Sequence, residues 1–132
     1  MTRILIADDD AASASFAFRV VRRALPCARV ETAASGREAL ELLLSATCDL
    51  AILDQLMPGL SGLQVLKHLR GRGVDVPVLL LTEWATRELA RAAAALGAED
   101  LLEKPIIAPG LALSVRRIAG RARQGARRGA GS

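Results

Sequence analysis

Ile4-Leu5-Ile6-Ala7-Asp8-Asp9-Asp10 is an apolar run that leads directly into three aspartates. A second apolar run, Leu50-Ala51-Ile52-Leu53, ends on Asp54. Runs of this length and composition are typical of strands that are buried on both faces. If both strands deliver their carboxylates to one place, at least three acids converge there. Like charges that lie so close together are costly unless a proton or a cation neutralises them. Mg²⁺ is the usual cation for an all-oxygen pocket.

Two further apolar runs end in residues that can serve the same site. Val78–Leu81 is followed by Thr82, and the short run Leu101-Leu102 leads into Lys104-Pro105. Acids, a hydroxyl and one lysine at successive strand ends predict a site that handles a phosphoryl group. An aspartate after a strand is also a common helix N-cap, which is our interpretation of Asp10. Two adjacent residues cannot both cap one helix, so the aspartates at positions 8 and 9 are assigned to the site.

The apolar runs alternate with stretches of helical period, which predicts a parallel sheet with crossover helices. The second strand is more polar and is expected near an edge of the sheet; the five strands are expected at residues 3–7, 29–33, 49–53, 76–81 and 99–102. Helices are expected at about 12–25, from 36, from 62, from 87 to 97 and after 109. Five such units fit a doubly wound α/β fold, whose ligands bind outside the carboxyl ends of the strands.

Local signals indicate where several helices begin and end. Ser35 with Glu38, and Ser61 with Gln64, have the spacing of a capping box, in which each side chain accepts the backbone N–H of the other residue. We also expect Thr86 to cap the helix that follows it. At the other end of that helix, the glycine at position 97 suits a left-handed terminus.

Length and composition limit the classes of protein that fit. The 132 residues are enough for one domain with a sizeable core. No apolar run approaches the roughly 20 residues that a membrane span needs, and residues 1–3 lead straight into a strand, so neither a span nor a signal peptide is expected. Cys27 and Cys48 lack metal-like spacing. They are expected to be reduced thiols of a cytoplasmic protein, and a disulfide is the alternative.

The net charge of +4 comes from the end of the chain. A Gly/Ala/Arg segment there holds Arg121, Arg123, Arg127 and Arg128 and no acid, and without these four the basic residues equal the 14 acidic ones in number. We therefore expect a domain over residues 1–120 and a disordered basic tail or linker over residues 121–132. Nucleic-acid binding is not expected, because four arginines without tyrosine and with a single tryptophan offer no stacking surface.

Together these motifs resemble the receiver domain of two-component response regulators. The resemblance covers about residues 2–120, in the family's order and spacing, and rests on Ile4–Asp10, Asp49–Asp54 with Met57-Pro58-Gly59 and Ser61-Gly62, Leu81-Thr82, Gly97–Asp100 and Lys104-Pro105. It implies a flavodoxin-like fold with the strand order 2-1-3-4-5. It also implies that the protein is not an enzyme beyond Mg²⁺-dependent self-phosphorylation and dephosphorylation.

The resemblance implies a role for each acid of the site. Asp54 would accept a phosphoryl group from a phosphohistidine of a partner histidine kinase or phosphotransfer protein. Asp8 and Asp9 would hold Mg²⁺ together with Asp54 and the backbone carbonyl of Leu56. The metal would offset charge on the transferring group, as phosphoryl transfer requires.

The remaining site residues and the output are implied in the same way. Lys104 would pair with the phosphoryl oxygens, and Thr82 would hydrogen-bond to the phosphoryl group once it is in place. The Lys104–Pro105 bond would be cis, which only a following proline makes inexpensive. The output would be a changed surface for a downstream partner that the sequence does not identify. Where a homodimer forms, the family's usual face consists of the fourth helix, the fifth strand and the fifth helix.

Several positions depart from the family's pattern. Leu101 stands where an aromatic residue usually couples the threonine to that face, so a weakened or reworked switch is expected. Glu83 follows the threonine where a small residue is usual, and with the bulky Trp84 it predicts slower phosphorylation and a longer-lived phosphate. Ile106 replaces a common aromatic residue, which we interpret as a simple hydrophobic exchange.

Two other functions stay open. A receiver-like interaction module that no longer takes phosphate would switch by partner binding alone, and Glu83 and Leu101 favour this alternative. A phosphatase of the haloacid dehalogenase type would use Asp8-Asp9-Asp10 as its Asp-x-Asp motif, with Thr82 and Lys104 in its later motifs. That class needs an acidic metal pair after the lysine, and no Asp or Glu follows Lys104 in this sequence.

Overall fold

The sheet has five parallel strands in the order β2-β1-β3-β4-β5, as expected. The computed structural model describes residues 2–130, and the side chains of residues 2–121. The strands are β1 (Arg3–Ala7), β2 (Arg29–Ala33), β3 (Leu50–Asp54), β4 (Val78–Thr82) and β5 (Asp100–Glu103). The helices are α1 (Ala11–Ala24), α2 (Gly36–Ser45), α3 (Gly62–Gly71), α4 (Arg87–Ala95) and α5 (Ala108–Ala130).

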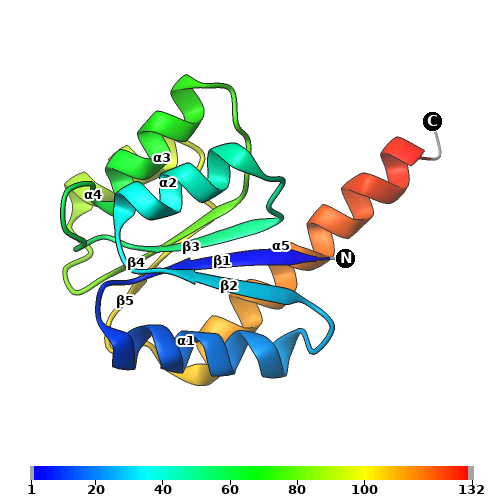
Figure 1. Ribbon diagram of the computed structural model, residues 1–132, viewed down its shortest axis with the longest axis horizontal. Helices are drawn as coiled ribbons and strands as arrows, with labels where there is room; N and C mark the ends of the chain where they lie inside the picture. Colours follow the sequence, from blue (N-terminus) through cyan, green and yellow to red (C-terminus); the bar gives the residue numbers. More distant parts are fainter. Residues whose placement is uncertain (1, 131–132) are drawn as a thin grey trace.

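Helices cover both faces of the sheet, with α2, α3 and α4 on one face and α1 and α5 on the other (Figure 1). Successive side chains of a strand point to opposite faces, so two separate cores form. In β3, Ala51 and Leu53 belong to the core under α2–α4, whereas Leu50 and Ile52 belong to the core under α1 and α5. Burial on both faces explains why β1, β3 and β4 have continuous apolar runs. The more polar β2 lies at an edge, as predicted.

Most of the predicted helix ends are confirmed. Asp10 caps α1 and accepts a hydrogen bond from the backbone of the first turn. Ser61 and Gln64 form the expected capping box at α3. Thr86 caps α4, and Gly97 after that helix has a left-handed φ of 74°. These caps determine where the loops at the carboxyl edge of the sheet begin and end.

The start of α2 differs from the predicted capping box. Ser35 accepts the N–H of Glu38, as expected, but the Glu38 carboxylate accepts the N–H of Ala34 at 3.1 Å rather than that of Ser35. The next residue, Gly36, lies so close to the loop after β3 that a Cβ would be 2.1 Å from the carbonyl oxygen of Leu60. The first turn of α2 therefore packs directly on that loop.

Helix α5 is longer than predicted. It continues to Ala130, whereas we expected the domain to end at residue 120 and a disordered tail to follow over 121–132. Alanine and arginine are strong helix formers, and their abundance in this segment offsets its glycines. In Figure 1, α5 extends past the amino edge of the sheet. Residues 131 and 132 lie outside the described residues, so the boundary of a tail or linker stays a prediction.

Both cysteines are free thiols, as predicted. Cys27 is exposed, and the Cys48 sulfur lies 3.4 Å and 3.2 Å from the carbonyl oxygens of Arg3 and Leu50. Burial raises the pKa of the Cys48 thiol, which therefore stays protonated and acts as a structural donor. Among the described helices, none is both long enough and apolar enough to cross a bilayer.

Candidate functional site

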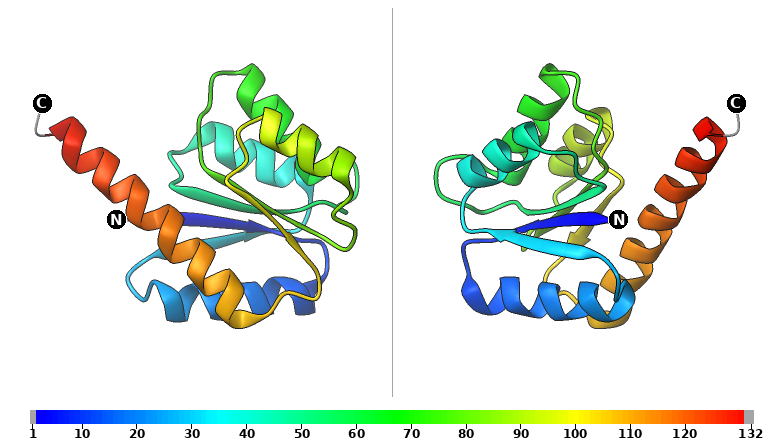
Figure 2. Two further views of the ribbon diagram at one scale, coloured as in Figure 1. Left: turned by 180° about the vertical axis from the view of Figure 1, so that it is seen from behind. Right: turned by 45° about the vertical axis from the view of Figure 1, so that its right-hand side comes forward.

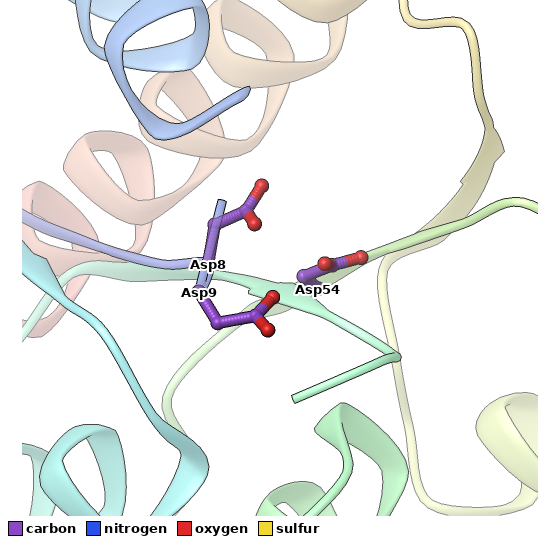
Figure 3. Close-up of side chains that lie close together, drawn as sticks. All are labelled: Asp8, Asp9 and Asp54. Atoms are coloured by element: carbon purple, nitrogen blue, oxygen red, sulfur yellow. The ribbon is translucent and has the colours of Figure 1, made fainter. Parts of the chain in front are cut away.

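Three aspartates meet at the carboxyl edge of the sheet (Figure 3). Asp8 and Asp9 come from the loop after β1, and Asp54 ends the neighbouring strand β3. Carboxylate oxygens of the three lie within 4.8 Å of one another. Asp8 and Asp54 are each only 5% exposed, whereas Asp9 is exposed. The structure thus brings together the acids that the sequence assigned to one site.

Lys104 is the cation that reaches these acids from within the described residues. Its Nζ lies 3.2 Å from Oδ1 of Asp54 and 3.6 Å from Oδ2 of Asp8. It also donates to Oγ of Ser13 in the first turn of α1, at 3.3 Å. The contact with Ser13 was missed by the sequence analysis, because a serine near the start of a helix carries no signal of its own. The Lys104–Pro105 peptide is cis, as the resemblance implied.

The electrostatics of the site favour a further cation. Burial, together with the charge of Asp8, raises the pKa of Asp54 to about 6, although Lys104 opposes the rise. Burial alone would lower the pKa of Lys104, but the carboxylates of Asp54 and Asp8 outweigh burial and its pKa is raised. Lys104 is therefore positively charged at neutral pH. One positive charge beside three carboxylates leaves the site with excess negative charge.

The donor set fits a hard divalent cation. The clustered side chains offer carboxylate oxygen alone, which suits Mg²⁺, an ion that also keeps several waters. The backbone N–H of Asp10 donates to Oδ1 of Asp8 at 2.9 Å and so orients that carboxylate. Leu56, whose carbonyl was predicted as a further ligand, lies in the turn after Asp54, and its side chain is exposed. The ligand role of its carbonyl stays a prediction.

The backbone around Asp54 is packed tightly against the start of α3. Oε1 of Gln55 accepts the N–H of Leu63 at 2.8 Å. A Cβ on Gly62 would lie 2.7 Å from the carbonyl oxygen of Asp54, so only glycine permits this approach. Gly59 is a turn residue with φ of 78°, whereas Gly62 is the first residue of α3 and packs against the backbone of Asp54.

Thr82 lies at the predicted place, at the end of β4 beside β3, and is 3% exposed. Its hydroxyl is engaged within its own loop. Oγ1 accepts the N–H of Trp84 at 3.2 Å and donates to the carbonyl of Trp84 at 3.3 Å. Glu83 and Trp84 are both exposed. The predicted effect of Glu83 on access to the site therefore stays a prediction.

Comparison with known proteins agrees with the family resemblance of the sequence. A family model described as the response regulator receiver domain matches residues 4–116. Response regulator MprA of Mycolicibacterium vanbaalenii is 40% identical over 109 residues, which cover 78% of this chain and 44% of the relative. Regulator of RpoS of Escherichia coli is 49% identical over 76 residues, covering 56% of this chain and 22% of the relative. The chain thus spans less than half the length of these relatives.

Solved structures share the fold. The chemotaxis response regulator CheY4 of Vibrio cholerae superimposes with a TM-score of 0.79 at 30% identity, over 89% of this chain and 98% of that one. The receiver domain of the Francisella response regulator 1452 gives a TM-score of 0.79 at 28% identity, over 92% and 98%. A receiver domain protein of Methanospirillum hungatei gives 0.86 at 22% identity, over 95% and 98%, and this likeness concerns the fold alone.

Proposed function

The chain belongs to the response regulator receiver domain family, and on that premise we propose that Asp54 accepts a phosphoryl group from a phosphohistidine of a partner histidine kinase or phosphotransfer protein. The observation that carries the proposal is the surroundings of Asp54. Its buried carboxylate lies 3.2 Å from Nζ of Lys104 and within 4.8 Å of two further acids. Receiver domains act as phosphoryl acceptors rather than as enzymes with turnover of a substrate, so the haloacid dehalogenase alternative is set aside.

In the proposed reaction an oxygen of Asp54 forms a bond to phosphorus while the bond from phosphorus to the histidine nitrogen breaks. The bonding electron pair leaves with the imidazole, and Asp54 becomes an acyl phosphate. The attacking carboxylate must be ionised, which it is above its pKa of about 6. Lys104 is in contact with this carboxylate and would pair with the phosphoryl oxygens as a point charge. The reaction therefore depends on positioning and charge, as phosphoryl transfer generally does.

We assign Mg²⁺ to the acid cluster as the cofactor. Asp8, Asp9, Asp54 and the backbone carbonyl of Leu56 would hold the ion, and all of them offer oxygen. When bound, the ion supplies positive charge beside the transferring oxygens. The side chains themselves do the rest: Asp54 attacks, and Asp8 stays oriented by the N–H of Asp10. Burial is the main cause of the raised pKa of Asp54, and the charge of Asp8 adds to it; this second contribution is the negative charge that a metal would relieve.

The test is intact mass after incubation with Mg²⁺ and acetyl phosphate, a small phosphodonor that needs no partner protein. We expect one added phosphoryl group on the wild-type chain, and none on Asp54→Ala or in a metal-free control. Labelling that persists in Asp54→Ala would overturn the assignment of the acceptor. If the wild type stays unlabelled with both acetyl phosphate and a phosphorylated histidine donor, the interaction module that does not use phosphate becomes the better function.

The partner that supplies phosphate is assigned to the groove between α1 and α5. The first turns of α5 lie next to α1 below the sheet (Figure 2), and α1 begins directly after the acid cluster. The groove has an apolar floor that includes Phe16 and Phe18. Its rim carries no acid and has four arginines that form no ion pair with any residue in the described part of the chain: Arg19, Arg22, Arg23 and Arg116. We expect the phosphodonor to present an acidic surface with apolar side chains here.

Charge reversal separates docking from chemistry. We expect Arg22→Glu with Arg23→Glu to slow transfer from a phosphohistidine protein about tenfold or more, and to leave labelling by acetyl phosphate within about twofold, because like charges across an interface are repulsive. The control is the double change Arg37→Glu with Arg72→Glu, which alters the net charge equally at exposed sites outside the groove. Equal slowing in both double variants would indicate a general charge effect and contradict the assignment.

The output and the location complete the proposal. Phosphorylation would change the surface of α4, β5 and α5, where a downstream partner or a second copy of the chain would bind. Two ion pairs connect this part of the chain to α5: Asp100 in β5 pairs with Arg117, and Glu99, directly before β5, pairs with Arg121. We place the protein in the cytoplasm, where its two free thiols would stay reduced.

A further inference from the structure

The loop between β4 and α4, residues 83–86, is held by hydrogen bonds rather than by apolar packing. All four residues are exposed, and Trp84 exposes 68% of its surface. Within the loop, Thr82 bonds to both backbone groups of Trp84, and the N–H of Thr86 donates to the Trp84 carbonyl at 3.0 Å. The direction of the Thr82 hydroxyl therefore depends on what keeps residues 84–86 in place.

Strand β5 holds this loop from outside. Oε2 of Glu103 accepts the backbone N–H of Ala85 at 2.9 Å. Glu103 ends β5, lies opposite Thr82 in the strand register and directly precedes Lys104. The N–H of Lys104 donates to the carbonyl of Thr82 at 2.7 Å. The end of β5 thus forms two hydrogen bonds to this region, one with the carbonyl of Thr82 before the loop and one with the amide of Ala85 within it.

The side chain of Glu103 lies on the same face of β5 as that of Leu101. Side chains two apart in a strand share a face, so Glu103 and Leu101 point the same way. Leu101 packs against the core under α2, α3 and α4 and has no polar atom with which to bond to the loop. On this face it is the carboxylate of Glu103 that connects β5 to the loop.

We propose that Glu103 is a positioning residue that controls the orientation of Thr82. While Glu103 holds the Ala85 amide, residues 84–86 keep the arrangement in which the Thr82 hydroxyl bonds to Trp84. The inference rests on the proposed function of Asp54, because Thr82 reaches a phosphoryl group there only after it leaves Trp84. Loss of the bond from Glu103 frees the loop and lets Thr82 exchange its partners faster. Labelling of Asp54 then becomes faster as well.

The experiment compares the wild type with Glu103→Ala, Glu103→Gln and Glu41→Ala. Glutamine keeps a side-chain oxygen that can accept the Ala85 amide, and Glu41 is an exposed acid of α2, remote in the fold from the loop. Amide hydrogen exchange at Ala85 is measured by NMR in Mg²⁺ without a phosphodonor. The initial rate of labelling by acetyl phosphate is measured by intact mass. Both changed positions, Glu103 and Glu41, are exposed, so the three variants should fold.

In Glu103→Ala we expect Ala85 to exchange about 5- to 10-fold faster, the size expected for loss of one hydrogen bond to a charged acceptor, and Asp54 to be labelled about threefold faster. Glu103→Gln and Glu41→Ala should stay within about twofold of the wild type in both measurements. Unchanged exchange at Ala85 in Glu103→Ala overturns the inference. So does a Glu103→Gln variant that is labelled as fast as Glu103→Ala, since charge beside Lys104 would then be the cause.

The two proposals fail in different ways. If no variant and no wild-type sample is labelled, the proposed function of Asp54 fails, and with it the effect of Glu103 on labelling. The exchange of the Ala85 amide still decides whether Glu103 holds the loop. If the wild type is labelled normally and Glu103→Ala changes neither measurement, the function of Asp54 stands and the inference about Glu103 is wrong.

Discussion

The two edges of the one sheet balance charge in opposite ways. At the carboxyl edge, three carboxylates converge on one lysine, and the pKa of Asp54 rises to about 6 because burial and Asp8 disfavour its charge. At the amino edge, one guanidinium, that of Arg70, is surrounded by backbone carbonyls. The carboxylates at the carboxyl edge keep an excess of negative charge that a ligand could neutralise. The guanidinium at the amino edge is stabilised by carbonyl dipoles of the fold itself.

Arg70 stands at the end of α3 and connects three segments. Its Nε donates to the carbonyl of Leu96 at the end of α4, at 2.8 Å. Its Nη1 donates to the carbonyls of Val74 and Val76 before β4, at 2.8 Å and 3.0 Å. Carbonyls at a helix C-terminus lack partners within the helix and attract positive charge. Arg70 therefore contributes to stability, whereas the acid cluster opposes it.

Removal of Arg70 should have the largest effect on stability. We expect Arg70→Met to lower the free energy of unfolding by about 3 kcal/mol, because several carbonyls lose a charged donor while the apolar length of the side chain is kept. Urea unfolding measures this, with Arg72→Met, an exposed neighbour, as the control. Labelling of Asp54 should persist at low temperature. A loss below about 1 kcal/mol would show that water replaces the guanidinium easily.

The two ends of α3 allow the edges to be compared within one helix. Gly62→Ala at the carboxyl edge should cost about 2 kcal/mol, since the new Cβ would lie 2.7 Å from the backbone oxygen of Asp54. It should also slow labelling, because Asp54 must shift. Gly71→Ala at the amino edge meets open space and should stabilise the protein by about 0.5 to 1 kcal/mol. Equal effects at both ends would contradict the close approach at Gly62.

Neutralising the acceptor should stabilise the metal-free protein. The pKa of Asp54 is raised from 3.8 to about 6, so its ionisation is disfavoured by the fold. Folding stability is therefore lost as pH rises from about 4 through about 6, and Asp54→Asn should escape this loss. We expect a gain of about 1 to 2 kcal/mol at pH 8 and little gain at pH 4. The gain in stability is smaller than the whole pKa shift of Asp54 would give, because asparagine leaves Lys104 without its nearest anion.

Magnesium should show the smallest effect on stability, and its effect should also be larger at high pH than at low pH. Protons compete with the metal for Asp54 as pH falls through about 6, so Mg²⁺ should stabilise the wild type more at pH 8 than at pH 5. We expect a gain of about 1 kcal/mol at about tenfold excess over the dissociation constant. Urea midpoints with and without Mg²⁺ at both pH values measure it. Asp54→Asn is the control, and an equal gain in that variant would place the ion elsewhere.

The sequence was a good guide where a strand meets its loop. Apolar runs predicted the five strands within about two residues, and the residues that follow them predicted the site, because strand ends of a doubly wound sheet converge. The acids at positions 8, 9 and 54 and Lys104 do converge in the structure. What could not be predicted are contacts between segments that carry no periodic pattern. Examples are Ser13 beside Lys104, the carbonyls around Arg70, and Gly62 against the backbone of Asp54.

The orientation of individual side chains could not be predicted from the sequence either. The position of Thr82 followed from the end of its strand, but not the turn of its hydroxyl toward Trp84. Glu103 had no distinguishing feature, because a charged residue at the end of an edge strand is commonplace. The segment after residue 120 was predicted as a tail because it lacks apolar periodicity, whereas its alanines and arginines favour the helix that continues to Ala130.

The strand order has a consequence for how the chain folds during synthesis. β1 pairs with both β2 and β3, so these three strands can associate once residue 54 has emerged from the ribosome. That association gathers the three carboxylates, while Lys104 follows only with the last strand to be made. Because residues 1–54 are synthesised before Lys104, the repulsion within the acid cluster acts before its counterion is available. We therefore expect a nascent chain to delay the closure of this edge until β5 arrives, and dissolved magnesium to shorten that delay.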